Sequence, residues 1–308
     1  MKQTLLYTKK LHYKSLKGYE QLLLMLIPGI LYYIIFHYAP IYGIIIAFKD
    51  FTFKKGFLGS SWVGLKHFRL MFDNPSFYEV FGNTLVLGFL KLVIGFPIPI
   101  LFAILINEIR FIKIKKTVQT VSYLPHFLSW IVLGGMFFQI FSIHGPINEI
   151  IKLFGGEPIR FMTEPKPFRI VLVSTYVWKS MGWNSIVYLA AITGISPELY
   201  EAAMIDGANR FQRMWRITLP SLAPVITVML ILAAGQIIKD DFDQIFNLYN
   251  PAVYETADVI STYVYRQGLE MMNYSYATAV DLFKNIIALV FVFGTNRVAK
   301  SMNEYGIW

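Results

Sequence analysis

Four charged side chains lie inside stretches of this chain that are otherwise apolar, at Lys91, Lys179, Asp281 and Lys284. Charged groups at membrane depth usually face the interior of a helix bundle or water, where they pair with one another or mark a pathway. Asp281 and Lys284 are three residues apart, so on a helix they share a face and are expected to form an ion pair. Lys91 and Lys179 lie near expected helix ends, where a long stem can carry the ammonium group to the interface.

Aromatic and amide side chains accompany these charges in "VWKSMGWNSIVYLAA" (177–191) and "MNYSYATAVDLFKN" (272–285). Tyr and Trp near span ends commonly form an interfacial belt. The alternative is a polar-aromatic cavity, in which rings stack on a sugar and amides bind its hydroxyls. An amide inside a span needs a partner, which makes the Trp183-Asn184 pair the more suggestive one. The candidate substrate-pathway residues are Trp183, Asn184, Tyr276, Asp281, Lys284 and Asn285.

The residue patterns of common enzymes do not occur in the sequence. It contains no G-x-x-x-x-G-K-[ST] loop for nucleotide phosphates, no H-E-x-x-H and no G-x-S-x-G, so phosphate-loop ATPase, zinc hydrolase and serine hydrolase chemistry are not expected. The five histidines are scattered and there are no cysteines, which excludes thiolate metal sites and disulfides. The sequence therefore predicts no catalytic residue, no metal site and no cofactor bound by this chain.

The composition places the chain in lipid. Of its 308 residues, 56% are hydrophobic and 15% are charged, whereas soluble domains carry about 25% charged residues. The net charge is +9, but the basic residues gather beside apolar segments, as membrane headgroups and topology require. We therefore expect membrane lipids and not nucleic acid as the partner of these charges.

Six apolar stretches have the length of about 17–25 residues that a spanning helix needs. They are residues 21–48, 83–107, 120–142, 168–193, 219–238 and 274–296. Six spans place both ends of the chain on one side, and the segments on that side hold 14 Lys and Arg residues against 10 in the outer loops. The positive-inside rule then predicts cytoplasmic N- and C-termini. The predicted fold class is all-α, a polytopic membrane protein with a single domain over residues 1–308.

The stretch "LYEAAMIDGANRFQRMWRITLP" (199–220) instead predicts a short hairpin of two helices. Ser196 is a suitable N-cap before Pro197 at the first helical position, and the first helix is expected over 197–206. Gly207 fits the left-handed conformation that ends a helix. A second helix is expected from Arg210 to Thr218, with an apolar stripe at Phe211, Met214 and Trp215. From these residues alone, the hairpin lies either on the bilayer or on a partner protein.

The same stretch resembles the EAA loop of ABC importer permeases, through Glu201-Ala202-Ala203, then Asp206-Gly207-Ala208, then Ile217-x-Leu219-Pro220. Similarity to the LplB-type carbohydrate permeases, relatives of the MalF branch, extends over most of the chain. It is carried by "YAPIYGIIIAFKDF", "NTLVLGFLKLVIGFPIPILFAILINEIR", "QTVSYLPHFLSW", "WKSMGWNSIVYLAAITGISPELYEAA" and the terminal "NEYGIW".

This resemblance implies the type I ABC importer permease fold in a bacterial plasma membrane, with six transmembrane helices and a cytoplasmic coupling hairpin at 196–220. It implies a second permease subunit, cytoplasmic ATP-binding subunits that hold ATP and Mg²⁺, and an extracytoplasmic solute-binding lipoprotein. The substrate implied is a carbohydrate, and we expect a neutral or weakly charged oligosaccharide. The residues that would couple transport to the ATPase are Glu201, Ala202, Ala203, Asp206, Gly207, Ala208 and Phe211.

Other membrane protein classes fit the sequence less well. A secondary transporter would normally show repeat symmetry between its halves and would not need a docking hairpin on one side. A membrane enzyme or a channel would need a catalytic cluster or a polar pore helix, and the sequence shows neither.

Overall fold

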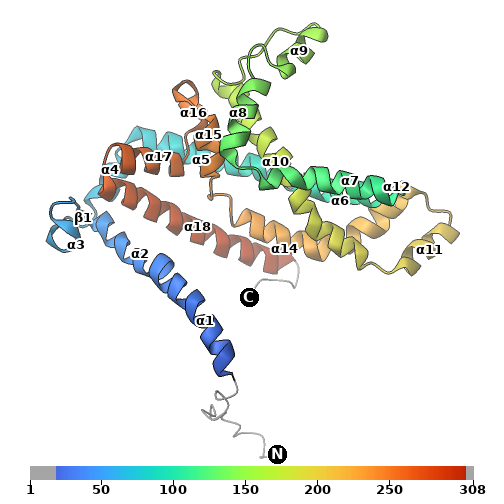
Figure 1. The fold of residues 1–308 in the computed structure, drawn as a ribbon, viewed down its shortest axis with the longest axis horizontal. Coiled ribbons are helices and arrows are strands. Elements are labelled where there is room, and N and C mark those ends of the chain that lie inside the picture. The colour runs from blue at the N-terminus through green and yellow to red at the C-terminus, as the bar shows by residue number, and fades with distance from the viewer. Residues whose placement is uncertain (1–18, 303–308) are drawn as a thin grey trace, which may run out of the picture.

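The computed structural model describes residues 19–302, so the basic segment 1–18 and the terminal "NEYGIW" (303–308) lie outside the described residues. The described part is built from helices and one small sheet (Figure 1). Up to the middle of the chain the elements are α1 (Glu20–Tyr33), η2 (Ile34–Tyr38), α2 (Ala39–Ile41), η3 (Tyr42–Phe48), β1 (Lys49–Asp50), α3 (Gly56–Gly59), β2 (Ser61–Trp62), α4 (Lys66–Phe72), α5 (Pro75–Gly95), α6 (Pro97–Asn107), α7 (Ile112–Tyr123), η4 (Leu124–Phe127), α8 (Trp130–Ile140) and α9 (Pro146–Leu153).

The second half begins with one long helix and ends with another. Its elements are α10 (Pro165–Thr193), α11 (Pro197–Ile205), α12 (Arg210–Arg213), η5 (Met214–Thr218), α13 (Leu219–Ser221), α14 (Ala223–Ala234), α15 (Phe242–Leu248), η6 (Pro251–Val253), α16 (Tyr254–Ala257), α17 (Ile260–Tyr265), η7 (Arg266–Glu270) and α18 (Tyr274–Met302). In Figure 1 the sheet lies at one end of the long helices and α11 lies at the other. We call these the sheet end and the hairpin end.

Within residues 19–302, three helical segments are long and apolar enough to cross a membrane: Gln21–Phe48, Pro75–Asn107 and Tyr274–Arg297. Two bent pairs of helices raise this number to five if each pair is one span. The predicted fourth span is a single continuous helix, α10, of 29 residues, but it does not reach the same apolarity. The structure thus bears out a chain of several apolar helices, while the number of six crossings stays a prediction.

The predicted third span, 120–142, is not one straight helix. The helical segments Ile112–Phe127 and Trp130–Ile140 meet at 106°, because a proline turn precedes the break and the Ser129 hydroxyl caps the new helix by accepting a bond from the Val132 amide. The ammonium of Lys179 donates to the carbonyls of Pro125, His126 and Leu128. Lys179 therefore does not extend to the interface as expected; it donates to carbonyls at the break, where the helical hydrogen bonding is interrupted.

The predicted fifth span, 219–238, also differs from the structure. Helical segment Arg210–Ser221 continues past the expected start, bends by 60° and gives way to α14, which ends at Ala234. Pro224 lies in the first turn of α14, where the missing amide hydrogen of proline costs no helical hydrogen bond. The segment 235–241, which follows α14, is not helical and connects α14 to α15.

The long helix α10 lies at the centre of the bundle, where it packs along α5 and α6. Two glycines allow backbones to approach closely. A Cβ on Gly182 of α10 would lie 2.1 Å from the carbonyl oxygen of Ser122, and a Cβ on Gly88 of α5 would lie 2.0 Å from that of Ile237. The second contact seats the segment 235–241 directly against α5.

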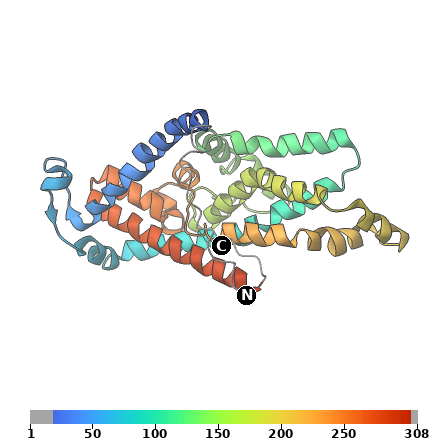
Figure 2. The ribbon, with the colours of Figure 1, turned by 90° about the horizontal axis from the view of Figure 1, so that it is seen from below.

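Several regions extend away from this bundle, and α8 and α9 form one of them (Figure 1). The segment Gln21–Phe48 has none of its most apolar window buried, and α1 diverges from the other helices (Figure 1). The hairpin at 196–220 projects beyond the ends of the long helices, and the view from below shows the same projection (Figure 2). At the sheet end, β1 and β2 pair antiparallel, with Lys49 opposite Trp62 and Asp50 opposite Ser61.

The contact at Gly88 makes a testable prediction. Gly88→Ala should push the segment 235–241 off α5 and lower the folding stability by about 1–3 kcal/mol, the usual cost of overpacking. Gly82→Ala, on the same helix, is the matched control, because a Cβ there meets nothing within 4 Å. The thermal midpoints of the two purified variants measure the difference, and equal midpoints would contradict the packing described for Gly88.

Candidate functional site

The 196–220 hairpin consists of α11, a turn at Gly207, and a second helical segment. Gly207 has φ +77°, as its predicted role in ending the first helix requires. The Ala208 amide donates to the Ala203 carbonyl at 2.8 Å, and the Gly207 amide donates to the Met204 carbonyl at 3.1 Å. These two bonds close the end of α11 and fix the direction in which the chain leaves it.

The ends of the hairpin helices differ in detail from the expectation. Ser196 makes no side-chain cap; its carbonyl accepts the Leu199 amide instead. The second helix is α-helical only over Arg210–Arg213 and continues as a π-helical turn to Thr218. Its start is held by Asn209, which accepts the Gln212 amide at 2.9 Å while the Gln212 side chain accepts the Asn209 amide at 2.8 Å. The sequence reading missed this capping box.

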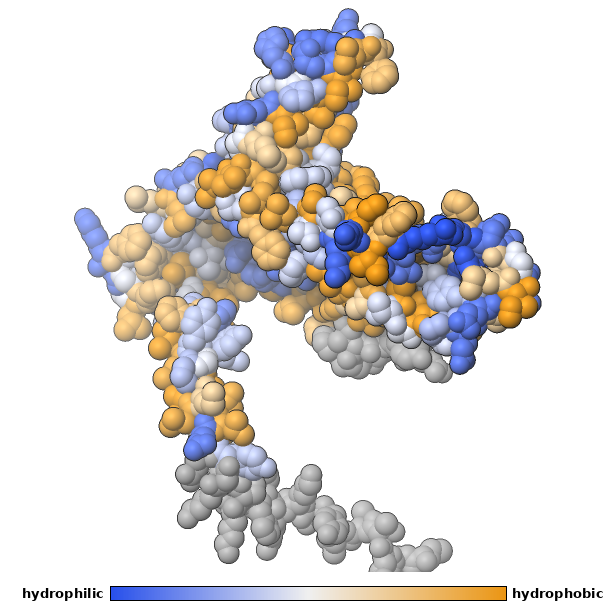
Figure 3. Space-filling model, turned by 45° about the vertical axis from the view of Figure 1, so that its right-hand side comes forward, coloured by the Kyte–Doolittle hydropathy of each residue, from blue (hydrophilic) through white to orange (hydrophobic). Residues whose placement is uncertain are grey.

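The hairpin leaves much apolar surface uncovered. No residue of α11 is buried, and the exposed side chains include Ile205 at 86% and Phe211 at 72%. The predicted coupling residues Glu201, Ala202, Asp206 and Gly207 are also exposed, while Ala203 and Ala208 are half-buried. Polar and apolar side chains alternate over this end of the molecule (Figure 3). An exposed apolar surface of this kind, next to charged groups, marks a site for another protein or for the membrane.

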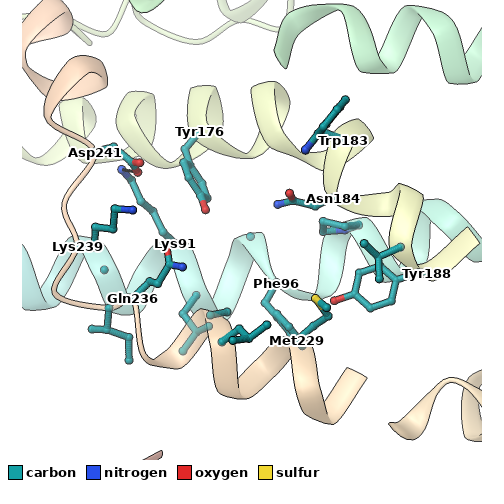
Figure 4. A pocket seen from close by; sticks show the side chains of 18 residues that line it. Lys91, Phe96, Tyr176, Trp183, Asn184, Tyr188, Met229, Gln236, Lys239 and Asp241 are labelled. Atoms are coloured by element: carbon teal, nitrogen blue, oxygen red, sulfur yellow. Dashed lines mark hydrogen bonds and ion pairs between the residues drawn. The ribbon is translucent and has the colours of Figure 1, made fainter. Parts of the chain in front are cut away.

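A second candidate site is a cavity of about 440 Å³ between α5, α6, α10 and α14. We call it the central cavity. The residues that define its two ends are labelled in Figure 4. Lys91, Lys239, Asp241 and Gln236 gather at one end, and Phe96, Tyr188 and Met229 at the other. Trp183 and Asn184 of α10 also line the cavity, on the side nearer Tyr188, while Tyr176 of the same helix lies closer to the lysines.

Lys91 does not reach the interface as the sequence analysis expected. Its residue is only 8% exposed, and its ammonium donates to Asp241 at 2.6 Å and to the Gln244 side chain at 2.7 Å. Gln244 in turn donates to the Leu172 carbonyl and the Thr175 hydroxyl of α10. Lys91 lies in the middle of the apolar segment Pro75–Asn107. Its ammonium is therefore stabilised by a partner inside the bundle and not by the membrane interface.

The expected ion pair between Asp281 and Lys284 is wrong. Lys284 donates to Asp240 and to the Ser261 hydroxyl, both at 2.5 Å, and Ser261 donates its amide and hydroxyl to the same carboxylate. Asp281 instead accepts a bond from Asn285 at 3.1 Å. Three donors surround Asp240, whose side chain is 2% exposed. This carboxylate is held in place more firmly than that of Asp281, which is half-exposed on the same helix as Lys284.

Trp183 and Asn184, the two predicted cavity residues on α10, both line the central cavity. Trp183 also packs against another part of the chain. Its ring stacks on His126 with centroids 4.4 Å apart and an interplanar angle of 1°, so Trp183 and Lys179, one turn apart, both hold the break after α7. Asn184 is exposed, and within residues 19–302 its side chain makes no hydrogen bond. Its amide therefore faces the cavity with its hydrogen-bonding capacity available.

The other predicted pathway residues do not line the central cavity. Tyr276 lines a separate pocket at the sheet end, where its hydroxyl bonds Tyr263 at 3.0 Å and accepts from Asn74. Asp50 lines the same pocket, and the neighbouring Lys66 ammonium lowers the pKa of its carboxyl. Asp281, Lys284 and Asn285 line neither space. The six candidates thus fall into three places.

The sequence reading missed the residues that neutralise the buried lysines. The predicted fifth span ends at residue 238, which leaves "KDDFD" (239–243) in an outer loop. In the structure Asp240 and Asp241 instead pair with Lys284 and Lys91 inside the bundle. The available signal was the balance of charge: the apolar stretches hold three lysines and one aspartate, and a buried charge needs a partner. This segment supplies two adjacent acids directly after an apolar run.

Comparison with known proteins identifies the family. The model for the family described as "Binding-protein-dependent transport system inner membrane component" matches residues 77–303, and the chain belongs to this family. It is accordingly a membrane permease subunit of a transport system and not an enzyme. This bears out the conclusion drawn from the missing catalytic motifs.

Its relatives are permeases of sugar transport systems. The chain is 46% identical over 290 residues to the polygalacturonan/rhamnogalacturonan transport system permease protein YteP of Bacillus subtilis, covering 94% of this chain and 90% of that protein. It is 42% identical over 295 residues to Protein LplB of the same organism, covering 96% and 93%. The resemblance to LplB-type permeases is confirmed.

The fold matches solved structures of an ABC transporter. One is the "crystal structure of a bacterial ABC transporter involved in the import of the acidic polysaccharide alginate", with 41% identity, a TM-score of 0.86, and coverage of 94% of this chain and 99% of that one. The other shows a bacterial alginate transporter with an alginate pentasaccharide-bound periplasmic protein, at 40% identity, a TM-score of 0.86, and coverage of 96% and 99%. The predicted all-α permease fold is confirmed.

The buried pair Asp240–Lys284 makes a prediction about stability. Asp240→Asn leaves an ammonium buried without its counter-ion and should cost about 3–5 kcal/mol. Adding Lys284→Met removes the unpaired charge and should recover most of the loss. Glu149→Gln is the control, because its pair with Lys152 has side chains 58% and 39% exposed and such pairs contribute about 0–1 kcal/mol.

The thermal midpoint of the purified transporter measures all three variants. A double variant as unstable as Asp240→Asn alone would show that the ion pair is not the reason for the loss.

Proposed function

We propose that this chain is one of two permease subunits of an ATP-driven importer that carries an acidic oligosaccharide into the cytoplasm. The observation that supports it most is the pairing of two features in one chain: a central cavity with a cationic end, and an uncovered hairpin at one end of the same helices. An extracytoplasmic binding protein would deliver the sugar, since a similar transporter has been solved in complex with an alginate pentasaccharide-bound periplasmic protein. It would dock at the sheet end, opposite to the hairpin.

A second permease subunit is supported by the first span. An apolar segment of 28 residues with none of its most apolar window buried gains no packing from its own chain, so it must contact lipid or another subunit. The central cavity is likewise bounded by this chain on α5, α6, α10 and α14 and needs a second wall to become a closed path. A heterodimer with a related permease supplies both.

The hairpin would dock on a cytoplasmic ATP-binding subunit, through Glu201, Ala202, Ala203, Asp206, Gly207, Ala208 and Phe211. ATP and Mg²⁺ would be held by that subunit, and this chain would hold no cofactor. Because a π-helical turn and α13 connect the hairpin to α14, a displacement of the hairpin is passed to a wall of the central cavity. Two global states, inward-open and outward-open, are what such coupling requires.

The hairpin end would face the cytoplasm of a bacterial cell. α1 runs towards the sheet and α18 runs away from it (Figure 1), so residues 20 and 302 lie at helix ends opposite to the sheet. This arrangement supports cytoplasmic N- and C-termini, as the distribution of basic residues predicts.

The proposed substrate differs from the neutral or weakly charged sugar expected from sequence. Lys91 and Lys239 both line the central cavity with one aspartate, so the charged lining residues carry a net positive charge, which attracts carboxylates. Rings and free amides along the same wall suit sugar faces and hydroxyls. Two relatives are named for polymers that carry uronic acids, polygalacturonan and alginate.

Coupling through the hairpin is tested at its turn. Gly207→Val places a β-branched residue at φ +77°, which strains the turn by about 1–2 kcal/mol and misplaces the second helix. We expect normal membrane insertion, while sugar uptake in proteoliposomes and sugar-stimulated ATPase activity of the assembled transporter both fall sharply.

Gly56→Val is the matched control. Gly56 has φ +63° and nothing within 4 Å of its added Cβ, so it carries the same backbone strain at the sheet end. Uptake and ATPase stimulation should stay near the unsubstituted values. If Gly207→Val behaves like Gly56→Val, the hairpin is not the coupling element.

A further inference from the structure

The charges at the cationic end of the central cavity do not balance. The 18 residues that line the cavity include two lysines and one aspartate. Asp241 is occupied by Lys91, and the adjacent Asp240 is occupied by Lys284. The five charged residues of this region therefore sum to one positive charge, and that charge belongs to Lys239.

Lys239 is placed differently from the other two lysines. It is exposed, whereas Lys91 is 8% and Lys284 is 9% exposed. Within residues 19–302, no carboxylate lies within the 4.0 Å that would make an ion pair with Lys239. Figure 4 shows it at the same end of the cavity as Lys91 and Asp241. An exposed ammonium next to a satisfied pair is available to a ligand.

Its neighbours add hydrogen-bonding groups to this charge. Gln236, one turn earlier in the same segment, is exposed and lines the cavity. The carbonyl of Gln236 accepts the Lys239 amide at 2.9 Å, and this turn fixes the two side chains on one short segment. The segment is itself seated on α5 by the close contact of Ile237 with Gly88, so the position of Lys239 is set by the packed backbone.

We propose that Lys239 is the residue that binds a carboxylate of the sugar in the central cavity, and that the Lys91–Asp241 pair keeps Lys91 from competing for it. This inference rests on the proposed function, because it assigns a residue to the recognition of its acidic substrate. The satisfied pair matters for transport as well as selectivity. If Lys91 and Lys239 were both unpaired, two cations would hold a uronic acid and slow its release towards the cytoplasm. With only Lys239 unpaired, the sugar is still recognised, and it dissociates more readily.

Lys239→Gln in the complete reconstituted transporter tests this assignment. The variant keeps the length of the side chain approximately and removes the charge. We expect kcat/KM for uptake of a short oligogalacturonide to fall by about ten- to a hundred-fold, since a hydrogen bond to a charged group contributes roughly 1.5–3 kcal/mol. Lys239→Arg keeps the charge and should restore most of the uptake.

Lys152→Gln is the matched control. Lys152 is an exposed lysine on α9 that lies outside the cavity, so its loss should leave uptake unchanged. Basal ATPase activity and the thermal midpoint of each variant show that it is folded and assembled.

The outcomes separate the inference from the proposed function. If the unsubstituted transporter does not take up the oligogalacturonide, the proposed acidic substrate is wrong. If it does, and Lys239→Gln retains full uptake, Lys239 is not the carboxylate-binding residue. The assignment is also overturned if Lys239→Arg is as defective as Lys239→Gln, because a positive charge would then not be the property that matters.

Discussion

A charge inside a membrane protein must be neutralised, and in this chain two adjacent aspartates do so for two lysines on different helices. Asp241 holds Lys91 on α5, and Asp240 holds Lys284 on α18. Gln244 extends the first pair to α10. Removing either aspartate would leave a buried ammonium unpaired, which is costly in a low-dielectric interior. The segment 235–241 is thereby fixed against three long helices, and the cavity beside it keeps its shape.

The 196–220 hairpin has the opposite character. Helices of this length are not stable on their own in water, and α11 buries no residue of its own. Its shape is held by local bonds: the closing pair at Gly207, the capping box at Asn209, and the contact between the Tyr200 and Thr218 hydroxyls at 2.9 Å. The hairpin is held by bonds within itself and is not covered by the rest of the described chain, so it is suited to docking on a partner. It continues through η5 and α13 into α14, which lines the cavity.

These two features explain what the sequence could and could not predict. The hairpin depends on neighbouring residues, so the positive φ of Gly207, the proline at the start of α11 and the start of the second helix at Arg210 could all be read directly. The ion pairs depend on residues far apart: Lys91 and Asp241 are separated by 150 positions. The sequence alone therefore predicted partners close by in the chain or in space. It placed the Lys91 ammonium at the membrane interface and paired Lys284 with Asp281 on the same helix.

The breaks in the third and fifth spans were missed for a related reason. Apolarity continues across the break at Leu128 and across the bend at Leu222, so a reading based on hydropathy sees one span in each case. The break in the third span is stabilised by Lys179 and by the Trp183 ring, which stacks on His126. Both of these side chains come from another helix, α10. Proline in both regions was visible in the sequence, but the angle of 106° depends on that tertiary support.

The most direct test of the account compares two substrates that differ only in charge. A short oligogalacturonide and its carboxyl-reduced counterpart share length and linkage. Each would be loaded onto the purified binding protein, and the loaded protein would be added to proteoliposomes that contain the complete transporter. ATP-dependent uptake is measured at low and high salt. The account predicts uptake of the acidic sugar that weakens as salt screens the cavity charge, and little uptake of the reduced sugar even when the binding protein is loaded with it. Equal uptake of both loaded sugars, independent of salt, would contradict it.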